Sequence, residues 1–224
     1  MKWTTPDHYF CEGSLNGLPE YYNAFSSLFI SYFGLLGLYE IQDDLMIQII
    51  YSLLSINGIS SFMYHWTGNI GFALYDEYPM IISLFLGNIY IDNLIPSKYK
   101  KYKILFNINL MILYLIINVM EDQRLIFPYY FACGLLYVLF NIKRFIRITN
   151  KLSLNEVPDK NVNYYSGIII ISALTWGLTE ISCKYDKINY TYIYLLGHPM
   201  WHFMISYGFY NLIKIIYKIK SRLY

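Results

Sequence analysis

Seven long apolar runs, separated by short polar segments, dominate this sequence of 224 residues. A helix needs about 20 predominantly apolar residues to cross the hydrocarbon core of a bilayer, and each run approaches or exceeds that length. Only 14% of the residues are charged, against about 25% in soluble domains. The sequence therefore predicts an all-α membrane protein, a single seven-transmembrane-helix bundle over residues 1–224. The predicted spans are Tyr21–Tyr39, Leu45–His65, Ala73–Ile91, Tyr102–Met120, Leu125–Ile142, Tyr164–Ile181 and Tyr190–Tyr217.

Two other architectures and one class of partner fit the sequence poorly. The runs are continuous rather than alternating with period two, which disfavours a membrane β-barrel, and they are too long for one soluble helical core. The formal charge of +2 and the lack of a basic face argue against nucleic acid as a partner. We therefore expect membrane lipids as the surroundings, and no protein partner is indicated.

The basic residues define an orientation for the predicted bundle. Of the 17 Lys and Arg residues, 13 fall on the side of the spans that carries the C-terminus and 4 on the side that carries the N-terminus. The positive-inside rule then places the N-terminus in the lumen or outside the cell and the C-terminus in the cytoplasm. The segment from Lys143 to Asn163 is the longest predicted loop. The basic tail from Lys214 to Arg222 is expected either to contact anionic headgroups or simply to anchor the last span.

Three histidines and one carboxylate lie inside or beside these runs, where titratable side chains are rare and usually functional. His65 ends the second run, Asp76 begins the third, and His198 and His202 lie one helical turn apart in the seventh. In the predicted topology all four lie toward the outer leaflet at similar depth. Three imidazoles near a carboxylate are typical of a catalytic zinc site. The alternative is that the histidines are hydrogen-bonded to neighbouring helices.

Two further side chains complete a candidate hydrolytic centre. Asp76 could act as the base that takes a proton from water, although an acid near a helix N-terminus also suits the helix dipole. Ser61 lies four residues before His65, on the same helix face, and could hold a developing oxyanion or merely pack. These residues predict hydrolysis of an acyl bond in a lipid, and they do not distinguish an amide from an ester.

The sequence also resembles the alkaline ceramidase family, seven-helix membrane hydrolases related to the adiponectin-type receptors, over roughly residues 9–210. The Asp-Glu-x-Pro-Met stretch and the Trp-His ending are the motifs closest to ceramidases. The matching residues are Phe10–Glu12, Glu20 with Asn23, Ser61 with His65, Asp76–Met80, Trp176 with Cys183, and His198–His202.

The resemblance implies a zinc-dependent amidase that cleaves ceramide to sphingosine and a fatty acid in the endoplasmic reticulum or Golgi. It implies zinc on the three histidines, with Ser61 and Asp76 as catalytic partners. It also implies a calcium site near the N-terminus, for which Glu12, Glu20 and either Asn16 or Ser14 are the candidates here.

The resemblance also bears on the cysteines, and two other functions compete with the one it implies. Cys11 and Cys183 fall on the same outer side and would form a disulfide, the alternative being two unpaired thiols. A lipid ester hydrolase of phospholipase A type is the enzymatic alternative. A seven-helix lipid receptor that keeps zinc for structure is the alternative from another class.

Overall fold

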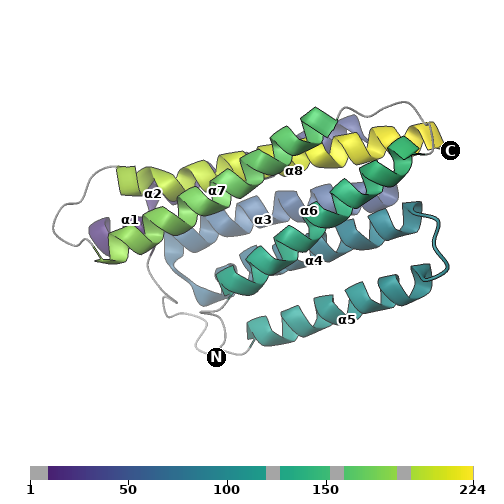
Figure 1. The fold of residues 1–224 in the computed structure, drawn as a ribbon. Helices are drawn as coiled ribbons and strands as arrows, with labels where there is room; N and C mark the ends of the chain where they lie inside the picture. Colours follow the sequence, from purple (N-terminus) through teal and green to yellow (C-terminus); the bar gives the residue numbers. More distant parts are fainter. Residues whose placement is uncertain (1–9, 120–126, 152–158, 186–192, 224) are drawn as a thin grey trace.

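The computed structural model describes residues 10–119, 127–151, 159–185 and 193–223, and these ranges form eight α-helices (Figure 1). The chain is all-helical, as predicted. The helices are α1 (Cys11–Asn16), α2 (Tyr21–Glu40), α3 (Leu45–Thr67), α4 (Ile70–Leu94), α5 (Lys100–Val119), α6 (Phe127–Lys151), α7 (Asp159–Tyr185) and α8 (Ile193–Leu223).

Each predicted span overlaps one of the helices α2–α8. Three of the described helices are long and apolar enough to cross a membrane, namely α3, α5 and the Lys160–Cys183 part of α7. The predicted loop from Lys143 to Asn163 is much shorter in the structure, because α6 continues to Lys151 and α7 begins at Asp159. The extension of α6 is amphipathic: Phe145, Ile146 and Thr149 are buried at helical spacing, whereas Lys143 and Arg147 are exposed.

A tight connection makes α3 and α4 antiparallel neighbours. Gly68 ends α3 in the left-handed conformation, with φ of 66°, which glycine adopts without steric cost. Asn69 then caps α4, because its side chain accepts a hydrogen bond of 2.8 Å from the backbone N–H of Gly71. As a consequence, the end of α3 and the start of α4 lie at the same end of the bundle.

Close helix packing surrounds this pair. α2 packs against α3 and α8, α8 packs against α7, and α4 packs against α3, α5 and α6. A Cβ atom at Gly58 would lie only 2.4 Å from the backbone nitrogen of Ser31, so the backbones of α2 and α3 touch there. Small residues at helix interfaces permit this approach in membrane bundles. In Figure 1, α5 lies at the edge of the bundle beside α4.

The bundle has two distinct ends. At the first, which we call the α1 end, α1 lies beside the start of α2 and the end of α7 (Figure 1). At the other, the tail end, α8 finishes beside the α2–α3 connection. A cavity of about 850 Å³ inside the bundle is lined by residues of α1–α4 and α6–α8.

Ion pairs hold the tail end together. Lys214 Nζ lies 2.7 Å from Glu40 Oε2, and Lys220 Nζ lies 2.6 Å from Asp44 Oδ2. Tyr90 also donates a hydrogen bond to the Asp44 carboxylate. Two lysines of the basic tail are thus bound to acidic residues of the protein itself.

Candidate metal centre

The three predicted histidines come together at the α1 end of the cavity. His65 lies near the end of α3, and His198 and His202 lie in the first turns of α8. Each histidine contributes one ring nitrogen to a group of three nitrogens that lie within 4.8 Å of one another. All three side chains are buried. Three converging imidazoles form a set that a divalent metal can bind.

A buried carboxylate orients His65. Its Nδ1 atom lies 2.6 Å from Oε2 of Glu20, which is itself buried. Because the carboxylate accepts this hydrogen bond, Nδ1 carries the proton and Nε2 is the nitrogen that can bind a metal. Carboxylate–histidine pairs of this kind are the usual support of metal-binding imidazoles. The backbone N–H of Phe10 and the amide of Asn23 also donate to Glu20, which fixes its position.

A serine orients His202. The hydroxyl of Ser26 donates its hydrogen to the backbone carbonyl of Asn23 at 3.0 Å, and its oxygen lies 2.9 Å from Nδ1 of His202. A hydroxyl has only one hydrogen, so the Ser26 oxygen accepts from Nδ1–H of His202. This assignment again leaves Nε2 of the imidazole as the candidate metal-binding atom.

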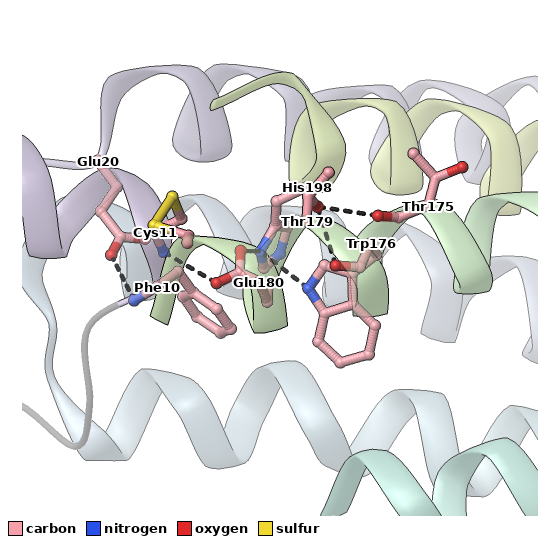
Figure 2. The surroundings of a disulfide bond; sticks show 9 residues. Phe10, Cys11, Glu20, Thr175, Trp176, Thr179, Glu180 and His198 are labelled. Atoms are coloured by element: carbon pink, nitrogen blue, oxygen red, sulfur yellow. Dashed lines mark hydrogen bonds and ion pairs between the residues drawn. A yellow bond between two sulfur atoms is a disulfide. The ribbon is translucent and has the colours of Figure 1, made fainter. Parts of the chain in front are cut away.

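Two residues of α7 meet His198 (Figure 2). The indole N–H of Trp176 donates a hydrogen bond of 3.2 Å to Nδ1 of His198, and Oε1 of Glu180 lies 3.4 Å from the same nitrogen. The other Glu180 oxygen accepts a hydrogen bond of 2.9 Å from the backbone N–H of Cys11. Trp176 and Glu180 lie one turn apart in the sequence, but only the structure gives them this role.

The chain segment before α2 is joined to the same region by a covalent bond. Cys11 and Cys183 form a disulfide that connects α1 to the end of α7, with Cα atoms 5.8 Å apart (Figure 2). Cys133, on α6, is a free and exposed thiol. The disulfide keeps α1 against α7, and therefore keeps the Cys11 N–H against Glu180.

The predicted catalytic pair lines the same cavity as the histidines, together with Asn57, which was not predicted from the sequence. Ser61 and Asp76 both line the cavity. Asn57 donates hydrogen bonds from Nδ2 to Oδ1 of Asp76 at 2.5 Å and to its backbone oxygen at 2.7 Å. Asn57, Ser61 and His65 lie four residues apart along one face of α3. This four-residue spacing is the sequence pattern from which Asn57 could have been predicted.

The candidate calcium residues are only partly together. Glu12 is buried and accepts hydrogen bonds from the backbone N–H groups of Tyr22 and Asn23, at 2.8 and 2.9 Å. It thereby caps the start of α2. Burial raises the pKa of the Glu12 carboxyl above its ordinary value, although these hydrogen bonds oppose the shift. Asn16, the last residue of α1, is exposed, and Ser14 of the same helix is also exposed.

A different asparagine lies between the two carboxylates. The backbone N–H of Asn23 donates to Glu12 and its side-chain amide donates to Glu20 at 3.1 Å. Its Oδ1 atom is buried and has no hydrogen-bond partner among the described residues. A buried amide oxygen beside two carboxylates is the type of ligand that calcium prefers.

The cavity is polar at the histidines and apolar beyond them. At the α1 end its lining includes the three imidazoles and the carboxylates of Asp76, Glu77 and Glu180, and none of the described lining residues is lysine or arginine. Toward the tail end the lining is mostly isoleucine, leucine and phenylalanine. Acidic groups and imidazoles without a compensating side-chain cation favour a bound cation, and the apolar part suits a hydrocarbon chain.

Comparison with known proteins shows a family and a relative to which this chain is similar. A model of the ceramidase family matches residues 5–223, a range that includes every residue described above. A protein of Dictyostelium discoideum named "Putative alkaline ceramidase dcd3A" is 26% identical over 228 aligned residues. The alignment covers 83% of this chain and 75% of that protein.

Proposed function

The chain belongs to the ceramidase family, and on that premise we propose that it is a membrane-embedded, zinc-dependent amidase that hydrolyses ceramide to sphingosine and a free fatty acid. One observation carries the proposal: three buried imidazoles converge at the polar end of a cavity whose other end is apolar. A ligand that matches this cavity has a polar group with the bond to be cleaved and a long hydrocarbon chain.

The proposed membrane arrangement uses all seven long helices. Helices α2–α8 would span the bilayer, with the α1 end on the lumenal or outer side and the tail end on the cytoplasmic side. The distribution of Lys and Arg supports this orientation, and a disulfide at the α1 end is compatible with an oxidising compartment. The endoplasmic reticulum or Golgi is the proposed location.

The donor set fits zinc at the histidine site. His65, His198 and His202 would hold the ion. Glu20 and Ser26 would orient His65 and His202 through their Nδ1–H groups, and Trp176 would orient His198 through its indole N–H. When bound, zinc would polarise the scissile carbonyl and make water more acidic. Three protein ligands leave room for substrate or water, which is the arrangement of catalytic rather than structural zinc sites.

The chain's own residues would move the protons. Asp76 takes a proton from the water that attacks the amide carbonyl carbon, and Asn57 holds the Asp76 carboxylate in place. Ser61 donates a hydrogen bond to the oxyanion that develops. As the C–N bond breaks, Asp76 returns a proton to the leaving nitrogen. The products are the amine of the sphingoid base and a carboxylic acid, so atoms and protons balance.

We propose a second cation site, for calcium, beside the first. Its ligands would be the carboxylates of Glu12 and Glu20 together with the amide oxygen of Asn23, whose burial without a partner among the described residues supports this choice over Asn16. Backbone carbonyls and water would have to supply the remaining oxygens, because calcium takes six to eight.

The test is metal analysis of the purified protein combined with hydrolysis of ceramides and phospholipids in detergent micelles. We expect about one zinc per chain, and release of both sphingosine and fatty acid from ceramide. Fatty acid released from phospholipid but not from ceramide would favour the ester hydrolase. Stoichiometric zinc and saturable lipid binding without turnover of either substrate would favour the receptor.

A further inference from the structure

Resting on the proposed function, we infer that Gly87 is a specificity-determining residue, which leaves the cavity open for the distal part of one hydrocarbon chain of the substrate. Gly87 lies in the middle of α4 and lines the cavity. A large side chain at this position would project into the apolar part of the cavity and shorten it.

The lining of α4 shows how far the cavity extends. Asp76, Met80, Ser83, Gly87 and Ile91 all line it, at spacings of three or four residues, so they form one stripe along the helix. From Asp76 to Ile91 the helix rises about 22 Å. The cavity therefore follows α4 for about three-quarters of the thickness of a hydrocarbon core.

The surroundings of Gly87 distinguish it from the glycines that pack helices together. A Cβ atom placed on Gly87 would meet no heavy atom within 4 Å, whereas one on Gly58 would clash with the backbone of α2. Glycine in a helix interior is less stable than alanine, and close packing does not require it at position 87. Gly167, on α7, is equally open but does not line the cavity.

The position of Gly87 corresponds to a chain length. Gly87 is eleven residues after Asp76, which is about 16 Å along the helix. An extended backbone advances about 3.6 Å over three bonds, or about 1.2 Å per bond, and a saturated chain has similar bond geometry. Gly87 thus lies at the depth of about the thirteenth carbon, and Ile91 at about the eighteenth.

The residues beyond Gly87 support a hydrocarbon chain as the occupant. The lining toward the tail end consists of apolar side chains from three helices, with no lysine or arginine among the described lining residues, so a polar group would find few partners there. These residues are Ile91, Val138, Ile142, Leu212, Ile213 and Ile216.

The experiment compares Gly87→Leu with Gly167→Leu. A helical side chain leans toward the N-terminus of its helix, so leucine at position 87 would project back toward the metal centre and shorten the cavity. Each purified variant is given two ceramide series, one with acyl chains of increasing length and one with sphingoid bases of increasing length. Metal content is measured in parallel, because it reports the integrity of the α1 end.

We expect Gly87→Leu to lose between about tenfold and a hundredfold in kcat/KM for chains beyond about 13 carbons in one of the two series. Chains of about six to eight carbons, which end well before Gly87 by the same spacing, should be hydrolysed within about twofold of the wild-type rate. Gly167→Leu should leave the dependence on chain length unchanged.

Three outcomes decide the inference. An unchanged dependence on chain length in both series would overturn it, while leaving the proposed function intact. A wild-type chain that hydrolyses no ceramide of any length would overturn the proposed function and this inference with it. If Gly87→Leu cannot be purified with its metal, Gly87→Ala is tested in its place. Its single methyl group should shift the preferred chain length by about one carbon, and the absence of a shift would count against the inference.

Discussion

Each end of the helix bundle contains a buried acidic side chain, Asp44 at the tail end and Glu20 at the α1 end, but the groups around them differ. At the tail end, Glu40 and Asp44 are each paired with a lysine of α8. At the α1 end, carboxylate oxygens of Glu20 and Glu180 lie 2.6 and 3.4 Å from Nδ1 of His65 and His198, whose imidazoles converge with that of His202. The first arrangement pairs each carboxylate with a lysine, whereas none of the described residues that line the cavity at the second is lysine or arginine.

This is the difference expected between an ion-pair clamp and a cation-binding site. An ion pair whose partners are both side chains stabilises the packing of two elements and leaves little electrostatic attraction for anything else. Converging imidazoles with carboxylates behind them are instead the usual form of a site for a bound metal ion. The predictions below test whether the two ends behave in these two ways.

The largest effect is expected for His198→Ala. Removal of one of three imidazoles leaves two ligands, too few for a stable zinc site, so metal binding and hydrolysis should be lost together. Metal content and ceramide hydrolysis are measured on the same preparation. Asn211→Ala, on α8 but outside the cavity lining, is the control and should keep both. Full activity in a metal-free His198→Ala protein would refute the role of zinc.

Asp76→Asn should separate chemistry from metal binding. The amide cannot accept the proton from water, so kcat should fall by about 10²- to 10⁴-fold, while the zinc content stays at the wild-type level. Single-turnover hydrolysis and metal analysis check this. A lipid receptor with structural zinc would keep its ligand binding and show no turnover in either protein, and that result would argue against the enzyme.

Glu20→Gln should weaken the metal site without abolishing it. Glutamine can still accept the hydrogen bond from His65, but it loses the negative charge, and we expect zinc affinity to fall by about 10- to 100-fold. Competition with a chelator measures the affinity. Glu40→Gln removes an acid at the tail end and should leave zinc affinity unchanged. Equal losses in both variants would mean that the two ends do not differ as argued.

Asn57→Leu tests the support of Asp76. Leucine has a similar size but donates no hydrogen bond, so the Asp76 carboxylate should become mobile and kcat should fall about tenfold, with KM and zinc content unchanged. Asn57→Gln, which retains an amide donor, should recover part of the loss. A change in KM alone would indicate that Asn57 shapes the cavity rather than positions the catalytic carboxylate.

The smallest effect on activity is expected for Lys220→Met, which breaks the clamp at the tail end. Asp44 would lose its ion pair while it stays buried, so the free energy of unfolding should fall by about 1–3 kcal/mol. Thermal unfolding in detergent measures the loss, and zinc content and hydrolysis should be unchanged. Lys218→Met, an exposed neighbour, should change stability by less than about 0.5 kcal/mol.

The same pair gives a pH dependence whose sign can be stated. Burial raises the pKa of Asp44, but hydrogen bonds from Lys220, Tyr90 and the Ile47 N–H outweigh it, so the pKa lies below its ordinary value of 3.8. The stability from ionised Asp44 is therefore present above pH 3.8 and is lost as the pH falls through the folded-state pKa. In Lys220→Met the free energy of unfolding should depend less steeply on pH in this acidic range. An unchanged dependence would exclude the Lys220–Asp44 pair as its cause.

The sequence predicted the helices because their signal is local. Continuous apolar runs identify α2–α8 without reference to the rest of the chain, and the four-residue spacing of His198 and His202 places them on one face of any helix. The short helix α1 was not predicted, since six residues cannot form a stable helix alone. It is held by the disulfide and by the contacts of Glu12 with α2.

The partners of the site residues were beyond the reach of local patterns. Asn57 and Asp76 are 19 residues apart, Glu20 and His65 are 45 apart, and Ser26 and His202 are 176 apart. Each pairing depends on how far a helix is rotated about its own axis, and packing at contacts such as Gly58 against α2 sets that rotation. The predicted calcium residue Asn16 illustrates the difficulty, because the asparagine between the two carboxylates is Asn23.

By itself, the sequence determined that this chain is a bundle of long apolar helices with three imidazoles at matching depth. Hydrophobicity and helical period act within a single segment and can be read along it. Only the tertiary structure decided which groups face those imidazoles, which carboxylates are neutralised by lysines, and how far the cavity extends past Gly87. Those properties arise from the relative rotation and distance of helices that are remote in sequence, and packing across the whole bundle fixes them.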